Sequence, residues 1–247
     1  MSPASQAPVL DLSDRNIRQR DIIKPEILST VAATIIGTGA IGRQVAIQLA
    51  AVGVPKIRLI DFDKVGVENL SAQGFREEDL DQFKVNAVAD VCKAINSTIE
   101  FTFVRGKYAK AHVAEMAKQL KKDDDLRLVY FICVDSIQVR KQIWKAYEVA
   151  LAKHERSLYV DGRMAAEAAN ILTVCHKDGV DYYPKTLFSN GDALEQSCTA
   201  KTTIYCASLA AGMMVGQFTK WLRGMCTDRD VLYNILACEL IRDAADQ

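Results

Sequence analysis

Three glycines are the first residues in this sequence whose spacing points to chemistry. Gly37, Gly39 and Gly42 form a G-x-G-x-x-G pattern between an apolar run and an amphipathic run. In such a pattern the first glycine permits a tight turn, the second lets the backbone approach a phosphate, and the third lets a helix pack closely on a strand. The N–H groups of that helix then face the anion. The pattern predicts a nucleotide-binding loop, with a tight turn that binds nothing as the alternative.

Carboxylates follow two other apolar runs. Asp61 ends the run 56–60, where an acidic side chain can accept hydrogen bonds from ribose hydroxyls. Asp63 either points to the same side of an extended chain or stabilises a turn. Asp135 follows the apolar run 129–134, and a single carboxylate at the end of a strand suits Mg²⁺, which takes few protein ligands. Capping of the next helix is a second role that Asp135 can fill.

Two further side chains stand where helices are expected to begin. Lys84 can place a point charge on a phosphate, or it is an ordinary surface lysine. A plain dinucleotide site has no evident use for Asn69 and Lys84, so these two residues favour phosphate chemistry on ATP. Cys198 precedes an apolar segment, and a thiol at a helix N-terminus is a better nucleophile than a free thiol. An ordinary loop cysteine is the alternative for Cys198.

The elements that position these residues alternate between strand and helix patterns. The first half predicts strands over 31–36, 56–60, 100–104, 126–134 and 157–160, with helices over 22–28, 41–52, 84–95, 111–120 and 137–152. The second half predicts an antiparallel strand over 169–175, a mobile loop over 184–199, an apolar helix over 202–219 and one or two strands over 231–241. We therefore expect an α/β fold with a doubly wound, mostly parallel, Rossmann-like sheet and antiparallel strands in its C-terminal part.

Composition narrows the class of protein. The length of 247 residues, with 49% hydrophobic and 25% charged residues, suits a single globular domain over 1–247 in which 1–14 form a flexible arm. Lys+Arg and Asp+Glu are equal at 31 each, so we expect no nucleic-acid or membrane partner. The segment 202–219 is too short and too polar for a membrane span and is expected in the core. The first residues do not resemble a signal peptide, so a cytoplasmic protein is expected.

Cysteine and histidine usage adds little chemistry. The sequence has 7 cysteines and no Cys-x-x-Cys pair, so neither zinc nor a disulfide framework is expected. Cys206 falls within the apolar helix and is expected in the core. His112, His154 and His176 are scattered, and we expect no chemical role for them.

Taken in order, the motifs resemble those of the ThiF/MoeB family, which has the fold of ubiquitin-activating enzymes. The resemblance extends from about residue 15 to the C-terminus. It rests on the glycine loop, D-F-D at 61–63, N-L at 69–70 with Gln73, Lys84, C-V-D at 133–135, R-N-I-R-Q at 15–19, V-D-G-R-M at 160–164 and the stretch 198–222. Family members bind ATP with Mg²⁺ and adenylate the C-terminal carboxylate of a small ubiquitin-like, β-grasp protein that ends in glycine. They are usually twofold dimers with shared sites.

The resemblance also implies roles by position. The expected nucleotide-binding residues are Gly37, Gly39, Ala40, Gly42, Asp61, Asp63, Asn69, Gln73 and Arg76. The expected catalytic residues are Arg18, Lys84, Asp135 and Cys198, with Asp135 as the Mg²⁺ ligand and Arg18 reaching the ATP of a partner subunit. Arg163 either faces the site from the end of its strand or serves a structural turn.

The sequence departs from the family pattern at one position that matters for rate. The family reads N-L-x-R-Q, whereas this chain has Ala72 in place of the arginine. Loss of such a donor lowers a rate about a hundredfold or more, and Arg76 is a candidate substitute. Three alternatives to protein adenylation stay open: a catalytically weakened scaffold, an enzyme that adenylates a peptide or other carboxylate, and a dehydrogenase that uses the glycine loop for NAD. The pathway, sulfur transfer or bacterial protein conjugation, also stays open.

Overall fold

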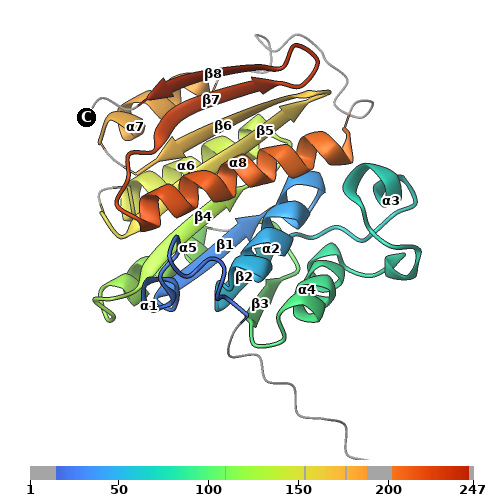
Figure 1. The fold of residues 1–247 in the computed structure, drawn as a ribbon, viewed down its shortest axis with the longest axis horizontal. Helices are drawn as coiled ribbons and strands as arrows, with labels where there is room; N and C mark the ends of the chain where they lie inside the picture. The colour runs from blue at the N-terminus through green and yellow to red at the C-terminus, as the bar shows by residue number, and fades with distance from the viewer. Residues whose placement is uncertain (1–14, 109, 153, 176, 188–201, 245–247) are drawn as a thin grey trace, which may run out of the picture.

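A single mixed sheet forms the centre of the molecule (Figure 1). The computed structural model describes residues 15–108, 110–152, 154–175, 177–187 and 202–244. Over these residues the sheet has 8 strands in the order β3-β2-β1-β4-β5-β6-β7-β8. The order places β1 at the centre of the parallel part, with β2 and β3 on one side and β4 and β5 on the other.

The parallel part carries the nucleotide-binding pattern. Its strands are β1 (Val31–Ile36), β2 (Lys56–Ile60), β3 (Glu100–Val104), β4 (Arg127–Ile132) and β5 (Ser157–Ala165). Three antiparallel strands extend the sheet: β6 (Ala168–Val174), β7 (Asp228–Asn234) and β8 (Glu239–Ala244). The expected fold class is therefore confirmed, including the antiparallel strands in the C-terminal part.

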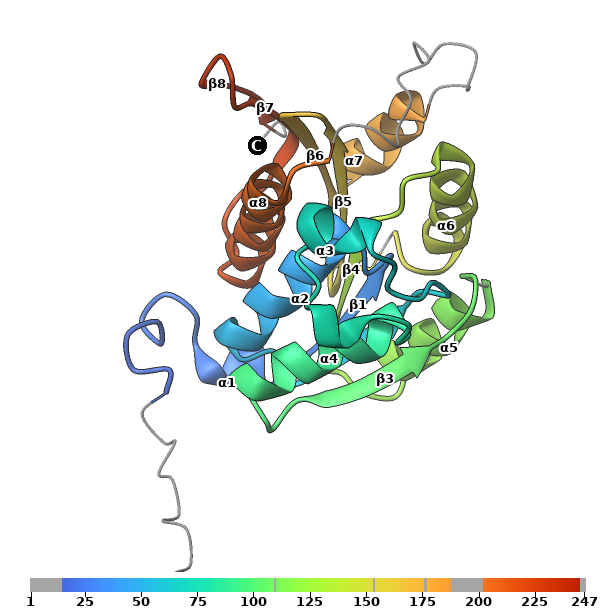
Figure 2. The same ribbon diagram turned by 90° about the vertical axis from the view of Figure 1, so that its right-hand side faces the viewer.

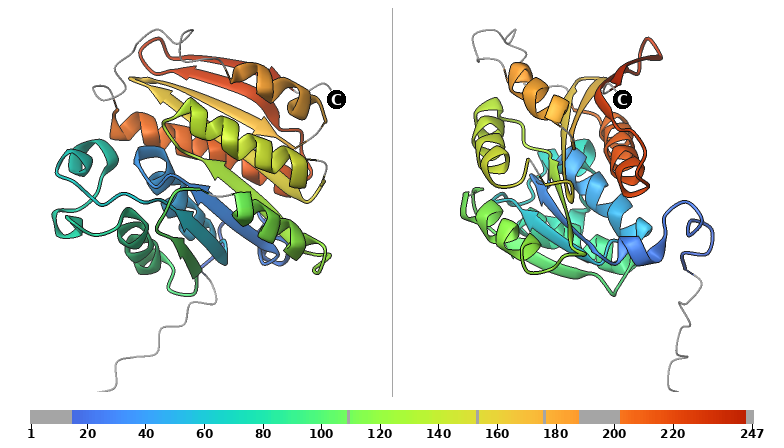
Figure 3. Two further views of the ribbon diagram at one scale, coloured as in Figure 1. Left: turned by 180° about the vertical axis from the view of Figure 1, so that it is seen from behind. Right: turned by 90° about the vertical axis from the view of Figure 1, so that its left-hand side faces the viewer.

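Helices cover both faces of the sheet (Figures 2 and 3). One face carries α1 (Pro25–Leu28), α2 (Ala40–Val52), α3 (Glu68–Gln73), α4 (Lys84–Ile95) and α8 (Ile204–Leu222). The other face carries α5 (Lys110–Leu120), α6 (Ile137–Ala150) and α7 (Lys177–Tyr182). Two 3₁₀ helices, η1 (Glu77–Asp79) and η2 (Tyr183–Thr186), follow α3 and α7.

The central strand shows why its sequence is continuously apolar. Val31, Ala33 and Ile35 pack into the core under α2, α4 and α8, whereas Ala32 and Ile36 pack under α5 and α6. Successive side chains of a strand point to opposite faces, so a strand covered on both sides has no polar face. This burial fixes the register of β1 and holds the glycine loop at the carboxyl edge of the sheet.

Several elements differ from the sequence expectations. The strand expected over 157–160 continues to Ala165, because a turn at Ala166 lets it pair with β6 as a hairpin. The short helices α3 and α7 were not expected, and the helix expected over 22–28 begins at Pro25. The loop expected over 184–199 begins inside η2, and its remainder from residue 188 lies outside the described residues, as do residues 1–14.

The apolar helix packs on the sheet through one face. Cys206, Ala210 and Met214 of α8 are fully buried, whereas Tyr205 and Leu209 are exposed. In the part of the chain that the structure describes, no helix is both long and apolar enough to span a bilayer. The helix therefore covers β5 and β6 as expected for a core helix, but it also exposes apolar side chains on its outer face, so its burial is only partial.

Candidate nucleotide-binding site

The three glycines of the loop differ in what a side chain would meet at their positions. Gly37 has φ +88°, and a Cβ there would lie 2.7 Å from the Cys133 carbonyl oxygen. A Cβ on Gly42 would lie 1.9 Å from the Gly37 carbonyl oxygen. The protein's own backbone therefore excludes side chains at both positions. At Gly39 a Cβ would make only an ordinary contact with a side chain, 3.5 Å from the Gln73 amide oxygen, so the protein's own backbone does not exclude a side chain there.

The loop leads into α2 without a capping side chain. Gly39 is the N-cap of α2, and no side chain accepts a hydrogen bond from the first turn. The first N–H groups of a helix have no partner within the helix and carry partial positive charge. A phosphate bound at the first turn of α2 would satisfy both features.

Asp61 is fixed against the glycine loop. Its Oδ2 accepts hydrogen bonds from Thr38 N at 2.7 Å and Thr38 Oγ1 at 3.0 Å, and its Oδ1 accepts one from Asp63 N at 2.9 Å. A carboxylate has about four acceptor sites, so one of those on Oδ1 stays available. This geometry suits a hydrogen bond from a ribose hydroxyl.

Lys84 stands at the first position of α4, where a cation is unfavourable unless an anion is near. The residue is buried, and its Nζ lies 3.2 Å from Asp63 Oδ2. The loop after β2 is tied to the start of α4 by a backbone hydrogen bond from Lys84 N to the Asp63 carbonyl, 2.9 Å long. Lys84 is therefore not an ordinary surface lysine, and Asp63 holds its ammonium group at the edge of the sheet.

Two amide side chains near the loop are incompletely hydrogen-bonded. Asn69 is buried and its Oδ1 accepts a hydrogen bond from Gly66 N at 3.0 Å, while its Nδ2 has no partner among the described residues. The Oε1 of Gln73 is buried and has no partner within the same part of the chain. Buried polar groups are nearly always paired, so the unpaired Oε1 of Gln73 next to Gly39 favours a ligand at the loop.

Asp135 leaves β4 next to the glycine loop. Gly37 packs against the chain at Cys133, two residues before Asp135. The side chain of Asp135 is exposed and makes no hydrogen bond or ion pair within the described residues. Ser136, and not Asp135, caps α6 by accepting a hydrogen bond from Val139 N, so the capping alternative for Asp135 is wrong.

A free carboxylate at this edge fits Mg²⁺. This ion keeps several waters and takes one or two carboxylates together with substrate phosphates. No group of three or more His, Cys, Asp and Glu side chains with metal-binding geometry occurs in the described ranges. Asp135 would therefore share the ion with phosphate oxygens and water, as Mg²⁺ sites on nucleotides commonly do.

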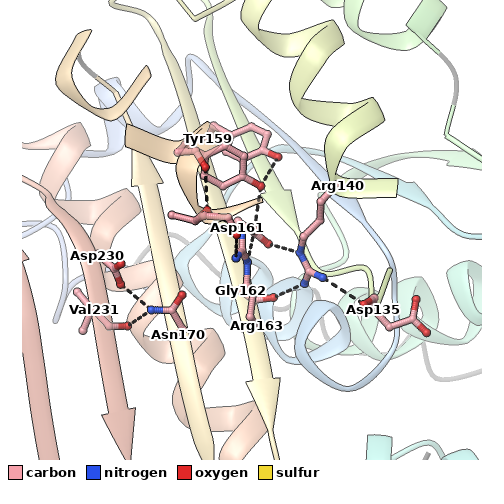
Figure 4. A network of polar contacts seen from close by, with 11 residues as sticks. Asp135, Arg140, Tyr159, Asp161, Gly162, Arg163, Asn170, Asp230 and Val231 are labelled. Carbon is pink, nitrogen blue, oxygen red and sulfur yellow. Dashed lines mark hydrogen bonds and ion pairs between the residues drawn. The ribbon is translucent and has the colours of Figure 1, made fainter. Parts of the chain in front are cut away.

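A buried ion-pair network supports the Asp135 segment (Figure 4). Arg140 of α6 donates to Asp161 Oδ1 at 2.9 Å, to the Gly162 carbonyl at 3.1 Å and to the Asp135 carbonyl at 3.3 Å. Asp161 is fully buried in β5. Burial alone would raise the pKa of Asp161, but the charges of Arg140 and Arg163 outweigh burial and hold this pKa below its ordinary value. The backbone of Asp135 is thereby tied to β5 through Arg140.

Arg163 belongs to the same network. Its Nε donates to Asp161 Oδ2 at 2.8 Å, and its two terminal nitrogens donate to Thr186 at 2.9 and 3.0 Å. Tyr183 also donates to Asp161 Oδ2, at 2.9 Å. Of the two expectations for Arg163, these contacts favour the structural role, because they fix η2 to the end of β5.

Other expected site residues are placed away from the loop or outside the description. Arg18 lies in the segment 15–23, which is held against the C-terminal ends of α2 and α4 by Gln19 and Arg15. Arg18 is therefore not brought to the glycine loop of its own chain. Arg76 pairs with Asp79 at 2.7 Å and with Glu78. Cys198 and His176 lie outside the described residues, and Cys206 is buried as expected.

Four residues around the site were not predicted from the sequence. They are Arg43, Arg140, Asp161 and Tyr183. Asp161 did carry a signal, because a lone carboxylate within an apolar strand must find partners. Arg140 and Arg43 carried none, since an arginine in an amphipathic helix is ordinarily on the solvent side.

Comparisons with known proteins agree with this arrangement. The model of the ThiF family matches residues 14–243. Mouse adenylyltransferase and sulfurtransferase MOCS3 is 28% identical over 191 residues, which cover 73% of this chain and 39% of MOCS3. Molybdopterin-synthase adenylyltransferase of Escherichia coli K12 is 30% identical over 128 residues, which cover 51% of this chain and 49% of the relative. The chain spans half or less of the length of the curated relatives it matches.

Solved structures share the fold at low sequence identity. E. coli MccB, crystallised with AMPCPP and MccA, gives a TM-score of 0.70 at 16% identity and covers 94% of this chain and 71% of MccB. PaaA gives a TM-score of 0.70 at 16% identity and covers 98% of this chain and 86% of PaaA. The matched span, the ordered motifs and the glycine loop agree, and the chain belongs to the ThiF family.

Proposed function

We propose that this chain is an ATP-dependent adenylyltransferase that activates the C-terminal carboxylate of a small ubiquitin-like or sulfur-carrier protein. The observation that carries the proposal is the difference between the three glycines of the loop. Gly37 and Gly42 are required by close approach of the protein's own backbone, whereas at Gly39 the fold itself makes no such demand, which supports a glycine kept there for close approach of a phosphate. The buried Oε1 of Gln73, which contacts Gly39 and has no hydrogen-bond partner within the described residues, also favours a ligand at this loop.

The reaction follows from the charges around the loop. A carboxylate oxygen of the substrate protein attacks the α-phosphorus of ATP, and the bond from that phosphorus to the β-bridging oxygen breaks. Pyrophosphate leaves with the electron pair, and an acyl adenylate forms. No general base is needed, because the attacking carboxylate is already ionised at neutral pH. The protein must instead hold two anions together, which is the task of preorganised donors and cations.

Named residues supply these donors and cations. The first N–H groups of α2 and the ammonium group of Lys84 would bind phosphate oxygens, and Asp61 would orient the ribose. Asp135 would hold Mg²⁺, which when bound neutralises phosphate charge. Arg140 would keep the Asp135 backbone in place. Arg18 would act on the ATP of a second subunit in a homodimer, and Cys198 would accept the activated acyl group.

An isotope-exchange assay tests the proposal. Purified protein is incubated with ATP, Mg²⁺, labelled pyrophosphate and a candidate β-grasp protein that ends in glycine. Label should enter ATP only when the carboxyl-terminal glycine is present, because exchange requires reversible formation of the adenylate. Absence of exchange with every candidate, together with tight binding of a nicotinamide dinucleotide, would overturn the proposal in favour of a dehydrogenase.

A peptide or another carboxylate is the second candidate substrate. It is favoured by the shared fold with MccB, which was crystallised with MccA. Exchange that depends on a short peptide, and not on any β-grasp protein, would establish this candidate. The nucleotide site and its chemistry would be unchanged.

The weakened scaffold is distinguished by Ala72, which lies in α3 and is partly buried. If the missing arginine limits the rate, Ala72→Arg should raise exchange about a hundredfold. If another cation already serves, the variant should gain nothing. Arg76 is the candidate from the sequence, although its pairing with Asp79 engages its guanidinium group.

A further inference from the structure

Arg43 is a buried cation without a hydrogen bond or an ion pair among the described residues. It lies in the first turn of α2, and only 7% of its surface is exposed. Its Nε is wholly buried without a hydrogen bond, and the guanidinium forms no ion pair within the described residues. A buried charge that lacks a partner destabilises a fold, and a cation near a helix N-terminus adds to that penalty. Burial of the charge and its place near a helix N-terminus both destabilise the fold, and a functional role for Arg43 would explain why the residue is tolerated.

The surroundings of Arg43 offer a cation–π contact with Phe75 but no free counter-charge. Its guanidinium carbon lies 5.3 Å from the centre of the Phe75 ring, and Nη1 lies 3.3 Å from where a Cβ of Gly74 would be. Burial lowers the pKa of Arg43, and the charge of Asp79 opposes this effect. However, Asp79 already accepts hydrogen bonds from Arg76 N, Nε and Nη2. The nearby carboxylate is thus engaged elsewhere.

The position of Arg43 places it beside the glycine loop. Helical side chains lean toward the N-terminus of their helix, which in α2 is Gly39. Gly39 faces the amide of Gln73, and Gln73 precedes Gly74, which borders the Arg43 guanidinium. The guanidinium therefore lies between the first turn of α2 and the C-terminal end of α3, next to the residue that follows Gln73 of the glycine-loop contact.

We propose that Arg43 is a further phosphate-binding residue, whose partner is the polyphosphate chain of the nucleotide. The proposal rests on the proposed function and names a residue that the sequence motifs did not include. Arg43 would supply, from α2, a positive charge that Ala72 in α3 does not supply. An arginine is suited to this task because its planar fork binds two phosphate oxygens at once.

Two substitutions separate this role from a structural one. Arg43→Met keeps the length of the side chain and removes its charge, while Arg43→Lys keeps the charge and loses the fork. The matched control is Arg127→Met, at the start of β4, where the arginine donates to Thr30 and Asp125 at the opposite edge of the sheet. Each protein is tested by thermal unfolding without ligand, and by calorimetry with ATP and, separately, with inorganic tripolyphosphate.

For Arg43→Met, ligand affinity and melting temperature are expected to change in opposite directions. Arg43→Met should weaken binding of both ligands about 10- to 100-fold and should raise the melting temperature, because a buried unpaired charge is removed. Arg43→Lys should retain part of the affinity. Arg127→Met should bind both ligands as the wild type does. A protein that serves function at the expense of stability shows this pattern.

Three outcomes overturn the inference. If Arg43→Met binds ATP as the wild type does, Arg43 is not a phosphate ligand, and the proposed function still stands. If Arg43→Met lowers the melting temperature, the guanidinium stabilises the fold through Asp79 or Phe75, and the inference also fails. If the wild-type protein binds neither ATP nor tripolyphosphate, the inference and the proposed function fail together.

Discussion

Arg140 Nε lies 2.9 Å from Asp161 Oδ1 in the interior of the protein, where Asp161 has no exposed surface. Asp161 also accepts hydrogen bonds from Arg163 and Tyr183, so one carboxylate holds two cations and a hydroxyl. This pair joins α6 to β5, and through the Asp135 carbonyl it reaches the proposed Mg²⁺ ligand. Stability and site geometry therefore depend on the same contact.

Removal of Arg140 should affect both the stability of the fold and the geometry of the site. Arg140→Met leaves a buried carboxylate with one cation fewer, so it should lower the free energy of unfolding by about 3–5 kcal/mol. Tyr183→Phe removes one neutral donor and should lower it by about 1 kcal/mol. Urea unfolding measures both values. Equal effects of the two variants would contradict the dominant role of the ion pair.

The same carboxylate predicts the behaviour of the protein in acid. The pKa of Asp161 is lower in the folded protein than its ordinary value of 3.8, and the same direction holds for Asp79 and Asp228. Their contribution to stability is complete above the ordinary value and is lost as pH falls through the lower folded values. Melting temperature should therefore fall steeply between about pH 5 and about pH 2. Asp161→Asn should flatten this fall and lower stability at neutral pH.

Gly39 and Gly42 should respond differently to alanine. Gly39→Ala meets only an ordinary contact, so the variant should fold with a nearly unchanged melting temperature but lose ATP affinity about tenfold or more. Gly42→Ala would force a Cβ against the Gly37 carbonyl and should not fold stably. Gly216→Ala, where a Cβ meets nothing within 4 Å, is the control. Unchanged ATP binding in Gly39→Ala would contradict a phosphate site at this loop.

Lys84 and Asp63 form a pair whose two members should not be equivalent. Lys84→Met should weaken ATP binding about 10- to 100-fold, because a charge-assisted bond to phosphate is lost. Asp63→Asn keeps the lysine and should change ATP affinity much less. Calorimetry of both variants at one salt concentration makes the comparison. Equal losses would show that the pair only anchors the start of α4.

Arg18 should act in a second subunit if the protein is a dimer with shared sites. Arg18→Ala and Lys84→Met should each be nearly inactive in pyrophosphate exchange. After subunit mixing, about a quarter of the sites should combine an intact loop with an intact Arg18. Recovery of activity on mixing supports this arrangement, whereas a monomeric and fully active protein by light scattering would contradict it.

Much of the fold could be predicted from the sequence, because the local hydrophobic pattern of each strand matches its burial in the structure. The strands β1, β2 and β3 were predicted with the bounds they have, since each is a short run ended by a glycine, acidic or basic turn. The glycine loop, Asp61, Lys84 and Asp135 were all placed at the carboxyl edge of the sheet. The short helices α3 and α7 were missed because six residues carry too little periodicity to stand out.

What the sequence by itself determined is the family, the alternation of strands and helices, and the glycine loop with its following acidic and basic residues. Only the tertiary structure decided which backbone groups exclude side chains at Gly37 and Gly42, since that depends on how close the Cys133 and Gly37 carbonyls come to them. It alone paired Arg140 with Asp161 and left Arg43 unpaired. Such contacts join residues far apart in the chain, and the energy of a buried charge depends on neighbours that no local pattern specifies.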